Sequence, residues 1–383
     1  MRRSIPANIV IPTGLALFAM FFGAGNMIFP IQLGISSGQH LLPAIVAFLI
    51  SGVGVPFLGL FAVSLYEGSY WNFFKRFGKV PAFLIVTFLI LIIGPLFAAP
   101  RTEIVTYNTL LPILPHALKG IYLFDLVYFL VVFAAVSKQS QVVDIIGWLL
   151  SPVKITAFLI LISLGIYTAV PVPSSELPAT HVFMSSLTMG YGTMDLLGAF
   201  FFCAVAYQYI VRKCHKINIT SPANIIKITF VSCVIGAALI GVIYVGLILA
   251  AASHSGALQG TATEALIGKI AYTVLGKYGQ IFVSVCVSFA CLATAIALTE
   301  VTADYLQQTI FRGKLPRLVC VVSVLVSMYM MAILGFDTIM KIAVPILNVL
   351  YPVLIVMCVV NIAYKLMPGR LVSTHDAVLR DVI

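Results

Sequence analysis

Long apolar segments follow one another along almost the whole chain, and this feature decides which kind of fold is open to it. A helix needs about 20 apolar residues to cross a hydrocarbon core of about 30 Å. Only 9% of the 383 residues are charged, against about 25% in an average soluble domain, and the mean hydropathy is +1.12. The sequence therefore predicts an all-α polytopic membrane protein, because helices satisfy their own backbone groups in lipid.

Apolar runs separated by polar, proline and glycine residues predict about ten transmembrane helices. A short helical pattern from Glu264 to Leu275 is too polar to span and is expected to lie on the outer surface, where it could serve as a lid. The predicted spans are approximately 8–34, 41–65, 81–109, 121–137, 144–169, 190–211, 224–252, 278–310, 317–335 and 339–365.

The basic residues predict the orientation of these helices. With the N-terminus inside, sixteen of the 22 Lys and Arg residues fall in inner segments and four in outer ones, while Arg101 and Lys154 lie within spans. Positive charge collects on the cytoplasmic side of membrane proteins. We therefore expect a multi-pass protein of the bacterial cytoplasmic (inner) membrane with both termini in the cytoplasm.

Two predicted spans contain glycine-rich interruptions, one at Gly23-Ala24-Gly25-Asn26 in the first span and one at Met189-Gly190-Tyr191-Gly192-Thr193, where the sixth span opens. They are five helices apart, and a second copy of a five-helix unit must enter the membrane inverted. We expect a 5+5 inverted repeat with helices 1 and 6 discontinuous. Residues 1–170 form the first repeat, 190–366 the second and 367–383 a short cytoplasmic tail.

Composition also argues against several classes of function. The formal charge of +10 is spread in short clusters between apolar runs, so no nucleic-acid partner is expected. The seven cysteines include no CxxC motif, and all six histidines fall in loops or in the tail, so we expect no metal, no catalytic residues and no cofactor. A transporter fits better than an enzyme, while a channel or a substrate-sensing receptor remains a remote alternative. The oligomeric state is left open.

A helix broken at Gly23 to Asn26 would expose backbone groups that can bind ions. Glycine inside a helix frees nearby backbone groups, which lipid cannot satisfy, so such a break is tolerated where it lines a cavity. The freed amides and the start of the next half-helix would suit a carboxylate, and the preceding carbonyls would suit a cation. Close packing through small residues is the alternative interpretation.

A resemblance to a known family is carried by four motifs, which are Gly23 to Pro30, Gly94 to Thr102, Tyr191 to Asp195 and Leu292 to Thr299. The sequence resembles the branched-chain amino acid:cation symporters of bacteria from residue 8 to about 365. The resemblance implies a leucine-transporter-like fold, import of leucine, isoleucine and valine, and usually sodium as the coupling ion. Methionine is an additional candidate, because an apolar pocket separates such substrates by only about 1–3 kcal/mol.

The resemblance also implies positions for the ligands. The amides of Ala24 and Gly25, which follow Gly23, would bind the substrate carboxylate, with Asn26 beside them. The ammonium group would meet the backbone of Gly190, Tyr191, Gly192 and Thr193, and Phe97 is a candidate wall for the aliphatic side chain. A sodium ion would meet the carbonyls of Ala19 and Phe22 and the hydroxyl of Thr294.

Charged residues within spans are candidate gating or relay groups, because charge is expensive in lipid. Asp195 either faces the cavity or pairs with Arg101. Glu300 and Asp304 share one helical face, and they either line an inner vestibule or pair with inner-loop arginines.

Lys154 departs from the pattern of these symporters. It stands near the middle of the fifth span, too deep for its ammonium to reach the interface. It resembles the fifth-helix lysine that replaces sodium in sodium-independent amino acid transporters of the same broad fold. Coupling to Na⁺ or to H⁺ therefore stays open, as does a sodium-independent permease or exchanger of other neutral amino acids. In the simpler alternative, Lys154 faces a water-filled vestibule and sodium binds as usual.

Overall fold

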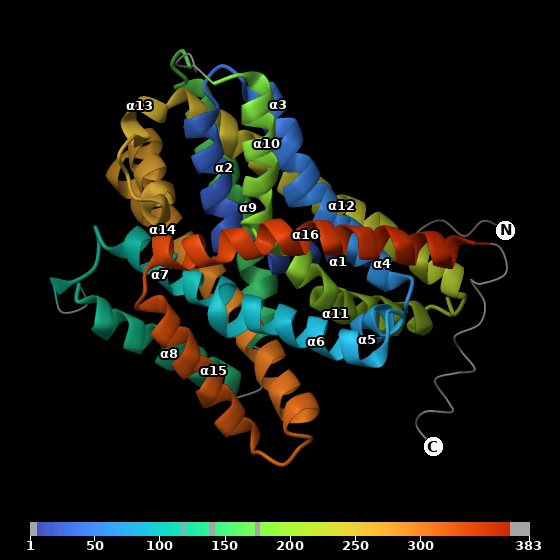
Figure 1. The fold of residues 1–383 in the computed structure, drawn as a ribbon. Coiled ribbons are helices and arrows are strands. Elements are labelled where there is room, and N and C mark those ends of the chain that lie inside the picture. Colours follow the sequence, from blue (N-terminus) through green and yellow to red (C-terminus); the bar gives the residue numbers. More distant parts are fainter. Residues whose placement is uncertain (1–5, 117–118, 138–141, 173–176, 368–383) are drawn as a thin grey trace.

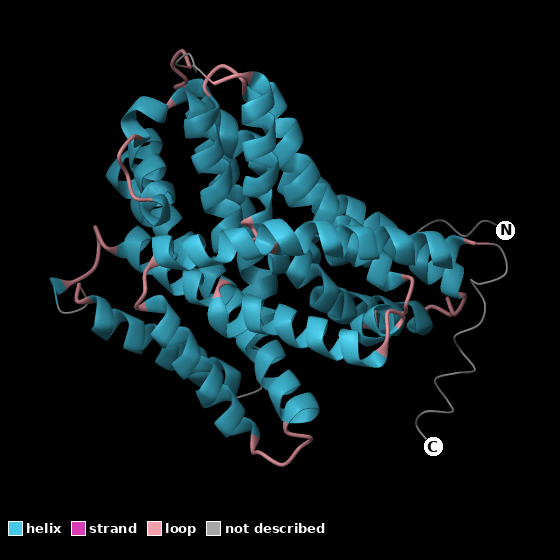
Figure 2. Cartoon of the chain, viewed as in Figure 1, coloured by secondary structure: helices cyan, strands magenta, loops and turns pink. Residues whose placement is uncertain are grey.

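The computed structural model describes residues 6–116, 119–137, 142–172 and 177–367, and every regular element in these ranges is a helix (Figures 1 and 2). Apart from Met367, the predicted cytoplasmic tail lies outside the described residues. In chain order the α-helices are α1 Ala7–Phe21, α2 Ala24–Ser37, α3 Leu41–Leu49, α4 Val55–Ser64, α5 Tyr70–Lys75, α6 Lys79–Leu91, α7 Ala98–Leu110, α8 Ile121–Ser137, α9 Val142–Tyr167, α10 Ala179–Tyr191, α11 Asp195–Lys216, α12 Pro222–Ser253, α13 Ser255–Leu258, α14 Leu266–Tyr305, α15 Arg317–Ala332 and α16 Phe336–Leu366.

Among the described residues, six continuous helical segments are long and apolar enough to cross a membrane. The pair α1 and α2 makes a seventh candidate, bent by 73° at its break. Three shorter apolar helices cover residues 121–137, 152–167 and 317–332, where the sequence predicted the fourth, fifth and ninth spans. The count of ten and the inverted repeat stay predictions. The six segments are Leu41–Ser64, Lys79–Leu110, Asp195–Lys216, Pro222–Ser253, Thr263–Ile310 and Phe336–Leu366.

Two of these segments continue through π-helical turns. Residues Ile50–Gly54 join α3 to α4, and Ile92–Leu96 join α6 to α7. The second turn is kinked at Gly94, whose φ and ψ of −82° and −106° are not helical, and the next residue is Pro95, which lacks an N–H group. A Cβ on Gly94 would run into the side chain of Thr302 on α14, so the kink brings α14 close to this turn.

The sixth predicted span corresponds to α11, and the helix α10 precedes it in the structure. The sequence predicted a span over 190–211 that opens at its glycines, whereas α10 precedes the break and α11 follows it. Serine and threonine residues lower the hydropathy of α10, but their hydroxyls bond within the helix: Ser186 donates to the carbonyl of Val182 at 2.5 Å and Thr188 to that of Ser185 at 2.9 Å. The segment is therefore helical despite its polar composition.

The segment predicted as an outer surface helix, Glu264 to Leu275, is helical from Leu266. Gly276 separates it from the rest of α14 with a φ of +68°, a conformation that glycine adopts without strain. Its function as a lid stays a prediction.

The interior of the bundle is aromatic, and the outside is apolar as well. Phe22 stacks on Phe18 with ring centroids 5.0 Å apart and meets Phe158 of α9 edge-on at 5.0 Å. On the outside, large apolar side chains are exposed on α15 and α16, including Met330 and Val349, at 61% and 71%. Such an exterior suits contact with lipid tails, because apolar surface of this extent is rare on soluble proteins.

Candidate functional site

Two breaks between successive helices meet inside the bundle. Phe22 and Gly23 separate α1 from α2, and residues 192–194 separate α10 from α11. A Cβ on Gly25 would lie 3.2 Å from the Cα atom and 3.3 Å from the carbonyl oxygen of Thr193. These contacts are tighter than side chains normally make, so a Cβ at this position would move the two breaks apart by a few tenths of an ångström.

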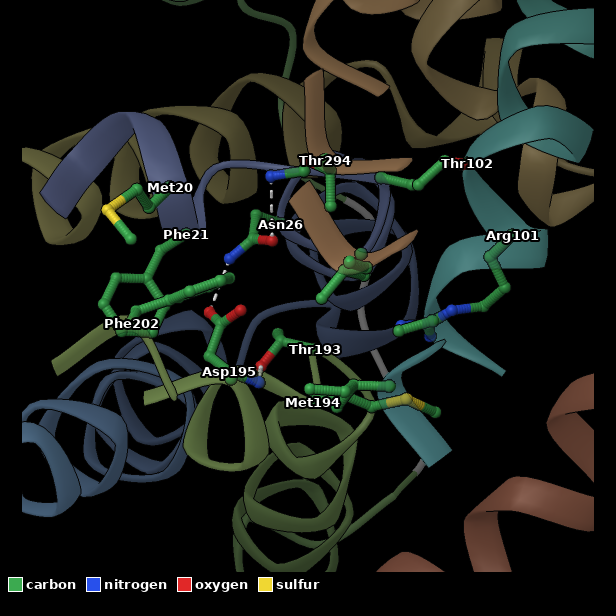
Figure 3. A pocket seen from close by; sticks show the side chains of 17 residues that line it. Met20, Phe21, Asn26, Arg101, Thr102, Thr193, Met194, Asp195, Phe202 and Thr294 are labelled. Atoms are coloured by element: carbon green, nitrogen blue, oxygen red, sulfur yellow. Dashed lines mark hydrogen bonds between the residues drawn. The ribbon is translucent and has the colours of Figure 1, made fainter. Parts of the chain in front are cut away.

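Asn26 connects the first break to the second. Its Nδ2 atom donates to Asp195 Oδ2 and to the hydroxyl of Tyr244, both at 2.5 Å, and its Oδ1 atom accepts from the amide of Gly23 at 3.2 Å. Tyr244, on α12, donates to the same Asp195 oxygen at 3.3 Å. Figure 3 shows Asn26 and Asp195 pointing toward one another from α2 and α11. The polar cluster therefore joins three elements distant in sequence.

The first break also lies against α14. Gly23 has an extended backbone, and a Cβ there would come 2.9 Å from Thr294 Oγ1, too close without a shift. The Thr294 hydroxyl donates to the carbonyl of Ala290 within α14 at 3.1 Å. The structure thus brings together Gly23 and the predicted sodium ligand Thr294, 271 residues apart.

The second break contains a strained residue. Met194 has a φ of +62°, in the left-handed region, which costs a non-glycine residue about 1–2 kcal/mol. Neighbouring bonds hold this conformation: the Thr193 hydroxyl donates to the Gly190 carbonyl at 2.9 Å, and Arg101 Nη1 donates to the Gly192 carbonyl at 2.8 Å. Arg101 is 2% exposed and lies 5.7 Å from the centre of the Phe29 ring.

A small cavity of about 40 Å³ lies at the junction of the two breaks (Figure 3). That is room for a few water molecules, so the conformation must widen to admit an amino acid. The lining includes Asn26, Thr193 and Asp195 together with Arg101, and Phe21 and Phe202 form an aromatic wall with ring centroids 5.3 Å apart. The remaining lining residues include Gly23, Ala24, Gly25, Thr102, Thr294, Met20, Ile93 and Leu298.

Several predicted site residues do not line this cavity. Phe97 is buried at the start of α7, and Tyr191 stacks on Tyr351 of α16 with ring centroids 4.4 Å apart. Gly190 packs against the π-helical turn, where a Cβ would run into Ser51. Ala19, Phe22 and Gly192 also lie outside the lining. No local pattern in the sequence distinguishes Tyr244, Phe21 and Phe202 from other residues of apolar runs, so these three were not predicted.

Comparison with known proteins decides the family. The family described as branched-chain amino acid transport protein matches residues 7–383. A protein of Staphylococcus epidermidis, named as an inferred branched-chain amino acid carrier protein, is 31% identical over 94% of this chain and 83% of its own length. A Staphylococcus aureus protein with the same description is 30% identical over 96% of this chain and 84% of its own.

The chain belongs to the branched-chain amino acid transport protein family. It is a membrane transporter rather than an enzyme, and a multi-pass protein of the bacterial cytoplasmic membrane.

Solved structures show that the transporter shares the fold of known carriers. The complex of MhsT with L-phenylalanine has a TM-score of 0.54 at 14% identity, covering 94% of this chain and 90% of MhsT. Mhp1, a nucleobase-cation-symport-1 family transporter, in a closed conformation with bromovinylhydantoin bound, has a TM-score of 0.64 at 16% identity, covering 95% of this chain and 79% of Mhp1. At such identities the likeness concerns the fold alone.

Lys154 of the transporter is buried, at 2% exposure, on α9. Its charge interacts with the thiols of Cys286 and Cys291 on α14, and among the described residues no hydrogen bond or ion pair reaches its ammonium group. Cys291 precedes Thr294 by three residues, so the two lie about one turn apart on one face of α14. Lys154 is therefore near the predicted sodium position without lining the cavity.

The candidate gating charges separate into two groups. Asp195 lines the cavity, and among the described residues it forms no ion pair with Arg101, although the charges of the two groups interact. Its function as a gating or relay group stays a prediction. Glu300 and Asp304 meet Arg317 of α15, with the charged atoms 3.6 and 3.4 Å apart. These partly exposed pairs join consecutive helices, so they brace α14 and α15 near the connection between them.

Proposed function

We propose that this protein is a secondary active transporter that imports leucine, isoleucine and valine, and also methionine, by symport with Na⁺ or H⁺. One observation carries the proposal: two helix breaks meet at Gly25 and Thr193, with Asn26 and Asp195 bridging them around a cavity. Such a junction offers backbone poles of both signs at one point in the membrane, which is what a zwitterion needs.

The substrate carboxylate binds the amides of Ala24 and Gly25 at the N-terminus of α2, whose dipole is positive there. The ammonium group binds on the opposite side, at Thr193 and the carboxylate of Asp195. The aliphatic side chain packs on Phe21 and Phe202, which form the apolar side of the cavity. A pocket of this kind accepts several aliphatic amino acids, because each methylene changes binding by only about 1–3 kcal/mol.

Two forms of coupling remain to be separated. In the first, sodium binds between the carbonyls of Ala19 and Phe22 and the hydroxyl of Thr294. In the second, the Lys154 ammonium takes the place of sodium, and transport is driven by protons or is uncoupled. The second form is favoured by the burial of Lys154 beside Cys291, a residue that lies one turn from Thr294 on α14. It also includes a sodium-independent permease or exchanger of neutral amino acids.

The purified protein in proteoliposomes tests the proposal directly. We expect saturable, stereospecific uptake of radiolabelled leucine and isoleucine when a sodium gradient or a proton gradient is imposed separately, with Asn26→Ala reducing uptake under either. A Gly256→Ala variant is the matched control, because a Cβ there meets nothing within 4 Å. Uptake that does not saturate would indicate a channel. If neither gradient nor counterflow moves either amino acid, the branched-chain assignment fails.

A further inference from the structure

Two acidic side chains lie buried side by side away from the substrate cavity. Glu103 of α7 and Asp125 of α8 are each 1% exposed, and their carboxyl groups interact. Asp125 belongs to the inward stripe of α8, with Tyr128, Phe129 and Val132, while the other faces of that helix are apolar and exposed. Neither residue was predicted from the sequence as a site residue, although an aspartate within an apolar run of this length was a usable signal.

Nothing in the described part of the structure compensates these two groups. Three of their four oxygens, Glu103 Oε1 and both oxygens of Asp125, have no hydrogen-bond partner, and neither carboxyl group has an ion-pair partner. The neighbouring hydroxyls point elsewhere: Tyr128 donates to Thr102 Oγ1 at 3.1 Å, and Thr106 donates to the Thr102 carbonyl at 2.6 Å. Two ionised carboxylates without partners are not stable at a buried position, because buried charge must be paired or neutralised.

A proton fits this site better than a metal ion. Two carboxylates only accept hydrogen bonds, so the pair can bond to itself only when one of them carries a proton. A hard metal cation takes about six oxygen ligands, and the site offers few beyond the two carboxyl groups, since the carbonyls of α7 and α8 serve their own helices. Among the described residues, no group of three or more metal-ligating side chains of His, Cys, Asp or Glu occurs.

The surroundings of the pair extend toward the surface of the protein at one end and toward the substrate cavity at the other. Tyr107 lies beside both acids, and its hydroxyl donates at 2.7 Å to the carbonyl of Lys119 in the connection between α7 and α8. At the other end, Thr102 lines the cavity and accepts the hydrogen bond from Tyr128. The titratable groups that interact with the pair are Tyr107 from α7, Tyr128 from α8 and Cys291 from α14. α15 also packs on α7 and α8 but contributes none among the described residues.

We propose that Glu103 and Asp125 form a proton-binding site that couples transport to the proton gradient. This proposal rests on the proposed transport function, and it adds a second ligand position outside the cavity. The proton enters past Tyr107 and is held between the two carboxyl groups. Its arrival changes the contacts of α7, the helix that also carries Arg101 and so holds the carbonyl of Gly192 at the second break. Proton binding is thereby linked to the geometry of the substrate cavity.

The test uses proteoliposomes with a pH indicator in the lumen. In the wild type, we expect an inward proton gradient to drive leucine accumulation, and leucine entry to carry protons into the lumen. Glu103→Gln and Asp125→Asn resemble the protonated form and cannot release a proton. Each should retain leucine counterflow while its accumulation ratio falls to about one and leucine-evoked proton entry is lost. Asp337→Asn, an exposed carboxylate at the start of α16, is the matched control and should leave all three readouts unchanged.

Two transport outcomes overturn the proposal. In one, the variants accumulate leucine under a proton gradient as the wild type does. In the other, the wild type accumulates leucine only under a sodium gradient and the variants lose that dependence, which makes the site a metal-cation site.

A second readout does not depend on transport or on the folding of variants. In infrared spectra of the wild-type protein, the pair should give the carbonyl band of a buried carboxylic acid at neutral pH, and isotope-labelled aspartate or glutamate should shift it. If leucine is not transported at all, the proposed function fails while this band still supports the proton site. A spectrum without the band at neutral pH overturns the site whatever the transport result.

Discussion

At the scale of single residues, the site depends on the absence of a side chain at two glycines. Gly25 lets α2 touch the second break at Thr193, and Gly23 lets the first break touch Thr294. Asn26 then fills the space between them with one side chain that caps the backbone of Gly23 and bonds to Asp195. Small residues bring the backbones together, and one amide side chain holds them in register.

Gly25→Ala tests this close approach. The added methyl group would press on backbone atoms of Thr193, which cannot rotate away, so the two breaks must separate by a few tenths of an ångström. We expect leucine affinity to fall about tenfold, equivalent to about 1.4 kcal/mol, while the folded protein persists. Scintillation proximity binding of radiolabelled leucine measures the change.

The control for this substitution is Gly256→Ala, on α13, where the same methyl group meets no atom within 4 Å. Equal leucine affinity in the two variants would contradict a substrate site at the junction of the breaks.

At the scale of elements, α7 connects the separate parts of the site. Three successive buried residues of this helix face three different partners: Arg101 the second break, Thr102 the cavity and Tyr128, and Glu103 the acid Asp125. Helical geometry separates consecutive side chains by about 100°, so one turn of α7 can serve all three directions. A small shift of α7 would therefore act on the breaks and on the acid pair together.

Two arginine substitutions compare a buried hydrogen bond between elements with partly exposed salt bridges between elements. Arg101→Gln removes the donor to the Gly192 carbonyl beside the strained Met194, and an unsatisfied buried acceptor costs about 1–3 kcal/mol. We expect a lower unfolding temperature in detergent and at least a tenfold loss of leucine uptake.

Arg317→Gln removes the partly exposed pairs to Glu300 and Asp304, and exposed pairs contribute about 1 kcal/mol or less. We expect uptake within twofold of the wild type. The interpretation of these pairs as a brace is wrong if Arg317→Gln changes uptake as strongly as Arg101→Gln.

At the scale of the whole molecule, the central question is which ion drives the conformational change. Thr294 on α14 lies against the first break, and Lys154 on α9 lies beside Cys291, one turn from Thr294, so a positive charge is already present near the place where sodium would bind. Because like charges repel, a charged lysine disfavours sodium there.

Lys154→Met therefore should create sodium dependence in leucine uptake. The measurement compares uptake with sodium and with choline at equal ionic strength. Lys365→Met is the matched control, because Lys365 is also buried, at 7% exposure, but lies at the end of α16 beside the ring of Tyr66. Unchanged ion dependence in the Lys154 variant would refute the substitution of lysine for sodium.

The sequence by itself determined the environment, the helical class and the family. Apolar runs admit only helices in lipid, and the glycine motifs of the first and sixth spans marked both breaks because a glycine in a spanning helix is a local, readable signal. The sequence did not predict the helix α10 before the second break, because its serine and threonine hydroxyls count as polar, although in the structure they bond within their own helix.

Tertiary structure alone decided which residues share a site. Tyr244 reaches Asn26 across 218 positions, Arg101 reaches Gly192 across 91, and Asp125 lies beside Glu103 because two helices pack there. It also turned Gly190, Tyr191 and Phe97 away from the cavity. Helix packing sets these pairings through the shapes of whole faces, and no local spacing in a sequence records how two distant faces will meet.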